Sequence, residues 1–432
     1  MKSLRIPLAF ALALIMVGCS NSKTSLPILD RPLGGPSHFV SQANRHGNFV
    51  KFRVPTLSSG LIAIAAGPDG NMWFTEDRAD KIGRISMSGA ITEFPLPTSN
   101  AGPLAITAGP DGNMWFAEAF YNGKIGRIST GGQITEFPLP SALGYACAAQ
   151  ITAGPDGAVW FGDPCNDGIG RVTTDGVFSP LVPTTGPPSG KFTSGPDGNV
   201  WFTEPSNGIV GKITPAGVLT EYTPPTQDSA PAGITEGGDG NMWFLEGNGG
   251  GKYGRITTSG VIKEFLGDGD ADGGTVMVEG PPDFRPTEKI LFATEQGENA
   301  IELFSVRKKA VIGEANLPNP GSNGSLNWIA LGPDGNMWFT LEAKNEIGVY
   351  VINKMSVVPT SLTLQVGQVS SVTVSEQHYT GAWTAASSND NVATVAPGPP
   401  SVFNVTGVST GTCTVTISDS MENSVPVVVT VQ

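Results

Sequence analysis

Short runs of alternating apolar and polar residues, separated by glycine-rich turns, recur along most of the chain. One unit occupies residues 105–140, where AITAG leads into the turn Asp111–Gly112 and is followed by NMWFAE, KIGRIST and QITEFPLP. Asp-Gly is typical of tight hairpin turns, and apolar alternation with a period of two is typical of strands with one buried face. Each unit therefore predicts four antiparallel β-strands.

The turn-and-strand phrase GPDGNMWF marks the repeat. It begins at Gly67, Gly109 and Gly332, and close copies begin at Gly154, Gly195 and Gly237. Successive copies from Gly67 to Gly237 lie 41 to 45 residues apart, and the longer gap before Gly332 holds a degenerate copy at Gly280. One four-stranded sheet cannot bury both of its faces, so neighbouring sheets must stack. Seven such units predict an all-β fold, a seven-bladed β-propeller over 49–353.

The first and last units predict how the ring closes. The last unit has three strands, LNWIALG, NMWFTLE and EIGVYVI, and lacks a fourth. The segment 49–56 begins with FVKFRVP, which imitates a fourth strand without a preceding blade. We expect it to complete the last blade and remove an open sheet edge. The repeated Trp and Phe are expected to fill the gaps between blades.

Residues 354–432 follow a different pattern of alternating strands without the WF phrase. Ser388–Val395 and Thr406–Thr416 match motifs of the bacterial Ig-like family (group 2), which this segment resembles over nearly its whole length. The resemblance implies an Ig-like β-sandwich that acts as a spacer or adhesive unit. Cys413 falls in one of its strands and is expected to be a small buried residue.

The N-terminus resembles a bacterial lipoprotein signal. Lys2 and Arg5 precede an apolar run that ends in Met16-Val17-Gly18-Cys19. This order predicts a signal peptide over 1–18, lipidation of Cys19 and a lipid-anchored protein of the bacterial cell envelope, with 19–48 as a flexible tether. The alternative is an ordinary cleaved signal with a chance cysteine.

Charge and cysteine content narrow the function. The formal net charge of −13 disfavours nucleic acid as a partner, since phosphate binding requires clustered Lys and Arg. We expect a monomer whose membrane contact is the lipid anchor alone. A hairpin that turns at Asp156–Gly157 places Cys147 opposite Cys165, which predicts a disulfide in an exported protein; two free thiols are the alternative.

The blade phrase GPDGNMWFTE…KIGRI…ITEFPLPT resembles the virginiamycin B lyase family across all the blades. That resemblance implies a seven-bladed propeller that opens streptogramin B rings by elimination with Mg²⁺. The family places its His or Tyr at the start of the innermost strands, in P-H-A-I-T, E-P-H-G and P-Y-G-I motifs. The matching positions here hold Ile62, Leu104, Ala149, Gly190, Ala232, Thr275 and Asn327.

The family's acidic position, two residues earlier, is also replaced. It holds Gly60, Gly102, Cys147, Pro188, Ala230, Gly273 and Ser325, and the three histidines, His38, His46 and His378, lie outside 49–353. Acid–base elimination needs a group of matched pKa at the substrate. We therefore predict a binding scaffold without the lyase's catalytic residues, for a small-molecule, glycan or protein ligand at the propeller mouth. The alternative is a metal-dependent lyase or hydrolase that uses non-equivalent residues, with Mg²⁺ as its cofactor.

Two acidic patterns suggest cation sites. Asp268, Asp270, Asp272 and Glu279 fit the spacing of a calcium loop, although strands rather than helices flank them; a solvated acidic loop is the alternative. A carboxylate also recurs directly after the second strand of the units. We expect these residues either to pair with a repeated cation such as Arg84, Arg127, Arg171 or Arg255, or to form an acidic ring on the binding face: Glu76, Glu118, Asp163, Glu204, Glu246 and Glu295.

Overall fold

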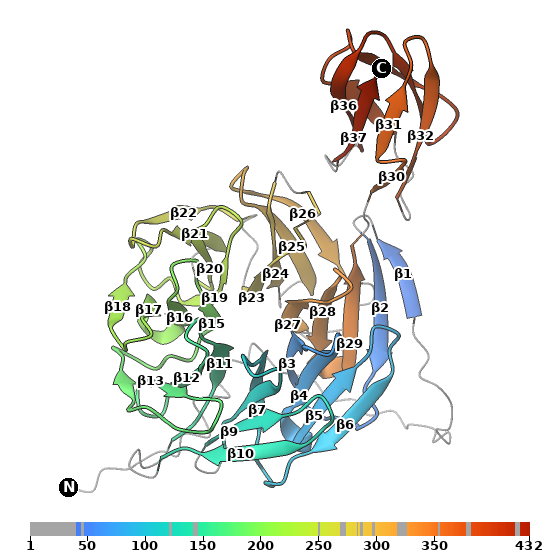
Figure 1. Cartoon of the computed structure of the whole chain (residues 1–432). Helices are drawn as coiled ribbons and strands as arrows, with labels where there is room; N and C mark the ends of the chain where they lie inside the picture. Colours follow the sequence, from blue (N-terminus) through green and yellow to red (C-terminus); the bar gives the residue numbers. More distant parts are fainter. Residues whose placement is uncertain are drawn as a thin grey trace, which may run out of the picture. The chain divides into compact units, whose positions relative to one another are not determined.

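The computed structural model describes residues 40–44, 47–120, 123–140, 146–248, 251–267, 274–282, 284–285, 288–295, 299–317, 326–352, 355–376, 382–419 and 424–432. These residues form an all-β protein, in which a seven-bladed β-propeller is followed by a β-sandwich (Figure 1). The propeller was predicted from the repeated strand pattern, and the sandwich was implied by the resemblance of residues 354–432 to a known family. In the described part of the chain, no helix is long and apolar enough to cross a membrane.

Each propeller blade is a sheet of antiparallel strands that follow one another in sequence. The innermost strands are β3 (Leu61–Ala66), β7 (Pro103–Ala108), β11 (Gln150–Ala153), β15 (Phe192–Ser194), β19 (Pro231–Glu236), β23 (Gly274–Glu279) and β27 (Leu326–Leu331). The second strands are β4 (Met72–Glu76), β8 (Met114–Glu118), β12 (Val159–Asp163), β16 (Val200–Glu204), β20 (Met242–Glu246), β24 (Ile290–Glu295) and β28 (Met337–Leu341).

The outer strands continue the same order. The third strands are β5 (Lys81–Ile85), β9 (Lys124–Ile128), β13 (Gly168–Val172), β17 (Ile209–Ile213), β21 (Lys252–Ile256), β25 (Ala300–Ser305) and β29 (Glu346–Val351). The fourth strands are β6 (Ile91–Pro95), β10 (Ile134–Pro138), β14 (Val182–Pro183), β18 (Leu219–Tyr222), β22 (Ile262–Phe265) and β26 (Ala310–Asn316). Short 3-10 turns follow three of the second strands: η3 (Asp77–Ala79), η5 (Pro205–Asn207) and η6 (Glu342–Lys344).

Strand β2 (Gly47–Arg53) supplies the fourth strand of the last blade. It pairs antiparallel with β29 (Figure 1). In this pairing Phe52 lies opposite Ile347. The innermost strand β3 of the first blade contacts β27 of the last, so the ring is closed. The closing strand was predicted from the sequence, but it begins two residues earlier than expected. In addition, β1 (Val40–Asn44) pairs with β2 as a fifth strand, inside the segment predicted to be a tether. The exposed edge of β2 offers unpaired backbone groups, which β1 satisfies.

The repeated phrase is explained by the contacts of its aspartate. In the first blade, Asp69 accepts hydrogen bonds from the Asn71 amide (2.8 Å) and the Trp73 indole (3.0 Å), and Gly70 takes a positive φ of 75° that suits glycine. The Arg84 guanidinium lies 3.7 Å from the same carboxylate and 5.5 Å from the Trp73 ring centroid. One turn therefore satisfies the polar edge of a buried tryptophan.

The aromatic side chains fill the gaps between blades, as predicted. Trp73 of the first blade packs in one cluster with Met114 and Phe116 of the second. On that same face, Phe116 lies against its cross-strand partner Gly126 of strand β9, where an added Cβ would come within 2.1 Å of the ring. The glycine of KIGRI is thus required for the approach of strand two's phenylalanine to strand three.

The C-terminal domain is a sandwich of two four-stranded sheets. One sheet contains β30 (Ser356–Val358), β32 (Val369–Ser375), β35 (Val402–Gly407) and β34 (Ala393–Pro397). The other contains β31 (Ser361–Leu364), β37 (Ser424–Val431), β36 (Gly411–Ser418) and β33 (Thr384–Ser387). Cys413 lies in the core between them and is 5% exposed.

Candidate functional site

Threonines on the second strands join the innermost strands of neighbouring blades. The Thr75 hydroxyl accepts a hydrogen bond from the Ala63 amide (3.0 Å) and donates one to the Leu104 carbonyl of the next blade (3.0 Å). Thr203 links the Lys191 amide (3.1 Å) to the Ala232 carbonyl (2.6 Å) in the same way. At the start of the innermost strands, backbone amides and carbonyls therefore take part in the hydrogen bonds that hold neighbouring blades together.

The link between the last and first blades repeats this arrangement. The Thr340 hydroxyl accepts from the Trp328 amide (3.1 Å) and donates to the Ile62 carbonyl (2.7 Å). Ile62, Leu104 and Ala232 are three of the seven positions at which an acid–base side chain would be expected in a lyase. Aliphatic side chains at those positions cannot exchange a proton near neutral pH.

A lysine amine and a tryptophan ring meet inside the ring of innermost strands. The Lys191 Nζ lies 4.0 Å from the centroid of the Trp328 ring. Lys191 directly precedes β15 and Trp328 lies on β27, while β15 contacts β11 and β19, and β27 contacts β23 and β3. The two residues thus come from blades that are not neighbours, and their side chains meet across the channel.

The environment of Lys191 changes its protonation. Burial within the ring lowers the pKa of its amine to about 7, because water no longer solvates the charged form fully. The side chain remains partly exposed, and in the described part of the chain no carboxylate lies within ion-pair distance of it. At neutral pH the amine is therefore available both as an ammonium and as a free base.

The six recurring carboxylates are buried between the blades. Their exposed fractions lie between 0 and 3%: Glu76, Glu118, Asp163, Glu204, Glu246 and Glu295. These side chains consequently do not form a solvent-facing ring. The prediction that these carboxylates pair with the arginines of the third strands is also wrong. Those arginines pair instead with the aspartates of the repeated turns: Arg84 with Asp69, Arg127 with Asp111, Arg171 with Asp156 and Arg255 with Asp239. Successive side chains of a strand point to opposite faces of the sheet. The arginine therefore lies on the same face as the tryptophan, and the glutamate lies on the other face.

Several of these glutamates lie beside a second carboxylate of the same blade. Burial, and then the charge of Glu136, raises the pKa of Glu118 to about 8. Glu136 itself accepts hydrogen bonds from the Thr98 amide (3.1 Å) and hydroxyl (2.6 Å) and pairs with Lys124, and these contacts hold its pKa below the ordinary value. The buried member is thus neutral at pH 7 while the partner stays ionised.

The buried glutamates of other blades also have raised pKa values, although those near 7 are only partly protonated at pH 7. Burial, followed by a neighbouring carboxylate, raises the pKa of Glu76 to about 7, of Glu204 to about 8 and of Glu246 to about 7. Their partners are Glu93, Glu221 and Glu264 on the fourth strands. Protonation removes the charge of the buried carboxyl and so reduces the cost of burying it.

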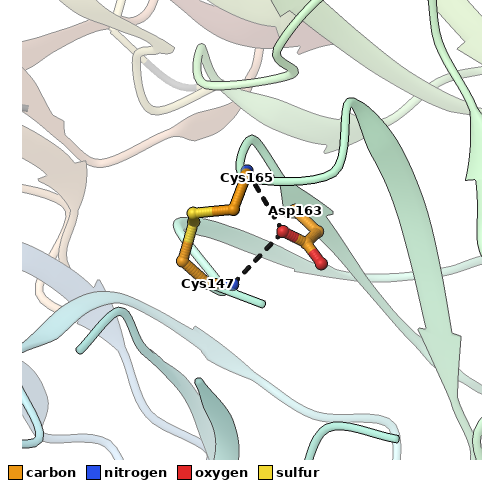
Figure 2. A group of neighbouring side chains, drawn as sticks. All are labelled: Cys147, Asp163 and Cys165. Carbon is orange, nitrogen blue, oxygen red and sulfur yellow. Dashed lines mark hydrogen bonds between the residues drawn. A yellow bond between two sulfur atoms is a disulfide. The ribbon is translucent and has the colours of Figure 1, made fainter. Parts of the chain in front are cut away.

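Asp163 differs from the five glutamates because it organises a disulfide. Cys147 and Cys165 are joined by a disulfide bond with a Cα–Cα distance of 5.7 Å, at the positions predicted from the hairpin (Figure 2). The Asp163 carboxylate accepts hydrogen bonds from the Cys147 amide (3.2 Å) and the Cys165 amide (3.1 Å). A third comes from the Asn166 side chain (2.8 Å). The carboxylate therefore fixes both ends of the covalent link.

This group does not fit a magnesium ion. Cys147, Asp163 and Cys165 are the one cluster of three metal-ligating side chains found in the described residues, and their donor atoms lie within 4.8 Å of one another. Magnesium prefers oxygen ligands, and the two sulfurs are already joined to each other.

Other predicted site residues lie outside the described part of the chain. They are Cys19, Asp268, Asp270 and Asp272. Glu279 is described: it lies half-buried on β23, and burial raises the pKa of its carboxyl despite the nearby Lys289. Its strand position matches that of Glu236 on the previous blade.

Sequence reasoning missed Lys191 and Trp328. Both residues lie four positions before the first glycine of the repeated turn phrase. Comparison of the seven units at that position would have revealed them, because the other blades hold Ala63, Ala105, Gln150, Gly233 and Val276 there. A lysine and a tryptophan depart most from these residues in charge and size.

Known proteins share the propeller. The virginiamycin B lyase family model matches residues 36–150 and 145–273. A streptogramin B lyase structure is 35% identical with a TM-score of 0.63, over 71% of this chain and 97% of that chain. The selenomethionine-substituted virginiamycin B lyase from Staphylococcus aureus is 33% identical with a TM-score of 0.62, over 73% of this chain and 100% of that chain.

A further solved structure bears on catalysis. It is a catalytically inactive virginiamycin B lyase from Staphylococcus aureus, with one histidine replaced by alanine, in complex with quinupristin. It is 32% identical with a TM-score of 0.62, over 73% of this chain and 100% of that chain.

Proposed function

Because the chain belongs to the virginiamycin B lyase family, we propose that its propeller binds a ligand without catalysing the family's elimination reaction. The observation that supports this most strongly is the absence of histidine from 47–377 of the sequence. In a relative, replacement of one histidine by alanine accompanies loss of catalysis. Fold alone does not preserve chemistry when the reacting side chains change.

The backbone of the inner ring supports the same proposal. Three of the seven positions that the resemblance assigns to catalysis, Ile62, Leu104 and Ala232, use their carbonyls to hold neighbouring blades together. Their side chains are apolar, so they can shape a binding surface but cannot transfer a proton. The binding face we propose is the end of the ring at which the innermost strands begin.

The test is a direct assay for elimination. Purified full-length protein is incubated with quinupristin and Mg²⁺, and intact antibiotic is followed by mass spectrometry, with an active virginiamycin B lyase as positive control. We expect no loss of quinupristin beyond that in buffer. Turnover would overturn the proposal and favour a metal-dependent lyase with non-equivalent residues.

Location is a second part of the proposal. A lipid on Cys19 would anchor the protein to the bacterial envelope, and the sandwich, which resembles bacterial Ig-like domains, would act as a spacer. Cys19→Ser should move the protein from the membrane fraction to the soluble fraction, whereas Cys413→Ser should not. Equal membrane association of the Cys19→Ser variant and the wild type would count against the anchor.

A further inference from the structure

The contact between Lys191 and Trp328 is not required by the repeat. At the same position, four blades have small or β-branched apolar residues: Ala63, Ala105, Gly233 and Val276. Those blades pair and pack as the others do, so the ring closes without a large side chain there. In repeats this regular, positions that depart from the shared residue are where function is expected.

The lysine occupies this position at an energetic cost. Desolvation alone lowers its pKa to about 7, with no contribution from a charged neighbour. The contacts observed for this residue are with uncharged groups. The Trp328 ring centroid lies 4.0 Å from the amine, and the Lys191 backbone amide donates a hydrogen bond to the Ala232 carbonyl (3.3 Å). The cation–π contact with the indole offsets part of this cost. Within the described residues, this cation lacks an acidic partner.

We propose that Lys191 and Trp328 form a binding site in the channel for a small organic carboxylate that carries a flat apolar ring. The carboxylate pairs with the ammonium, and the ring packs against the indole. This inference names the ligand class for the ligand-binding role proposed above and rests on it.

Charge pairing makes two demands on the ligand. An anion binds the protonated amine, so bound ligand favours proton uptake at Lys191. Affinity should therefore fall about tenfold for each pH unit above the amine's pKa. A neutral amide of the same shape keeps the ring contact but loses the ion pair, and it should bind at least about tenfold more weakly.

The experiment uses benzoate and its neutral isostere benzamide with the full-length protein. Binding is measured by isothermal titration calorimetry at pH 6.5, 8 and 9 for the wild type, Lys191→Met, Trp328→Leu and the exposed-lysine control Lys263→Met. We expect tighter binding of benzoate than benzamide, weakening with pH, and at least a tenfold loss in Lys191→Met and Trp328→Leu. Lys263→Met should bind as the wild type does.

A second measurement does not depend on the variants folding. Trace acetylation of wild-type protein, read by peptide mass spectrometry, gives the reactivity of Lys191 relative to Lys263. Benzoate should protect Lys191 and benzamide should not. Unchanged benzoate affinity in Lys191→Met, absence of benzoate binding, or a Lys191 that is never labelled would overturn the site. None of these results depends on quinupristin turnover, which tests the proposed function separately.

Discussion

Ser59 and Asn345, which are 286 residues apart in sequence, are joined by two hydrogen bonds. The Asn345 Oδ1 accepts from both the amide and the hydroxyl of Ser59, each at 2.9 Å. Its Nδ2 donates to the carbonyls of Val54 (3.2 Å) and Thr56 (2.8 Å). One buried side chain therefore ties the closing strand and the first blade to the last blade.

Asn345→Ala should destabilise the propeller by about 2–3 kcal/mol, because buried backbone groups at the ring closure lose their partners. The loss is measured by urea denaturation, followed by tryptophan fluorescence. Asn241→Ala is the control, since Asn241 serves a partly exposed turn and its loss should cost less than about 1 kcal/mol. Equal losses would show that Asn345 has no special role in closure.

Glu118→Gln should stabilise the protein above pH 8. The folded state keeps the Glu118 proton up to about pH 8, whereas the unfolded chain releases it near the ordinary value of 4.5. This group's contribution to stability is thus complete below pH 4.5 and is lost as the pH rises towards 8. A glutamine stays neutral, so we expect a gain of up to about 5 kcal/mol at pH 9, because each unit of pKa difference corresponds to about 1.4 kcal/mol, and little change at pH 4.5.

Its neighbour provides a control of opposite sign. The pKa of Glu136 is held below its ordinary value, chiefly by hydrogen bonds from Lys124 and Thr98 that outweigh its desolvation. This contribution is present above the ordinary pKa and is lost as the pH falls. Glu136→Gln should therefore lower stability at pH 7. Shifts of the same sign for both variants, measured by denaturation across this pH range, would contradict the paired-carboxyl interpretation.

The disulfide should contribute about 3 kcal/mol, the value expected from chain entropy for a short closed loop. Cys147 and Cys165 are separated by 18 residues. The double variant Cys147→Ser/Cys165→Ser should lose this stability in urea denaturation. Added dithiothreitol should destabilise the wild type by a similar amount and leave the double variant unchanged. An effect of dithiothreitol on the double variant would place the redox sensitivity elsewhere.

Calcium should raise the melting temperature if Asp268, Asp270 and Asp272 bind it, because ligand binding favours the folded state. Melting is compared with calcium and with EGTA for the wild type and for Asp270→Ala. The shift should disappear in Asp270→Ala and persist in Asp175→Ala, which alters an acidic residue in another blade. No shift in the wild type would exclude the site.

The candidate site was less accessible to prediction than the fold. The recurring glutamates could be counted in the sequence, but the face of the sheet they occupy depends on how the blades pack. Lys191 and Trp328 lie 137 positions apart in sequence, and their contact exists only because the ring brings nonadjacent blades together across the channel.

The sequence by itself determined the blades, their number and the strand that closes the ring. Those features follow from local rules: turn dipeptides set the hairpins, and period-two alternation sets which residues are buried. Tertiary structure alone decided that the glutamates are buried in carboxyl pairs, that the arginines join the turn aspartates, and that an isolated amine meets an indole. Protonation and charge pairing depend on desolvation and on groups that are distant in sequence. The local pattern of apolar and polar residues therefore cannot predict them.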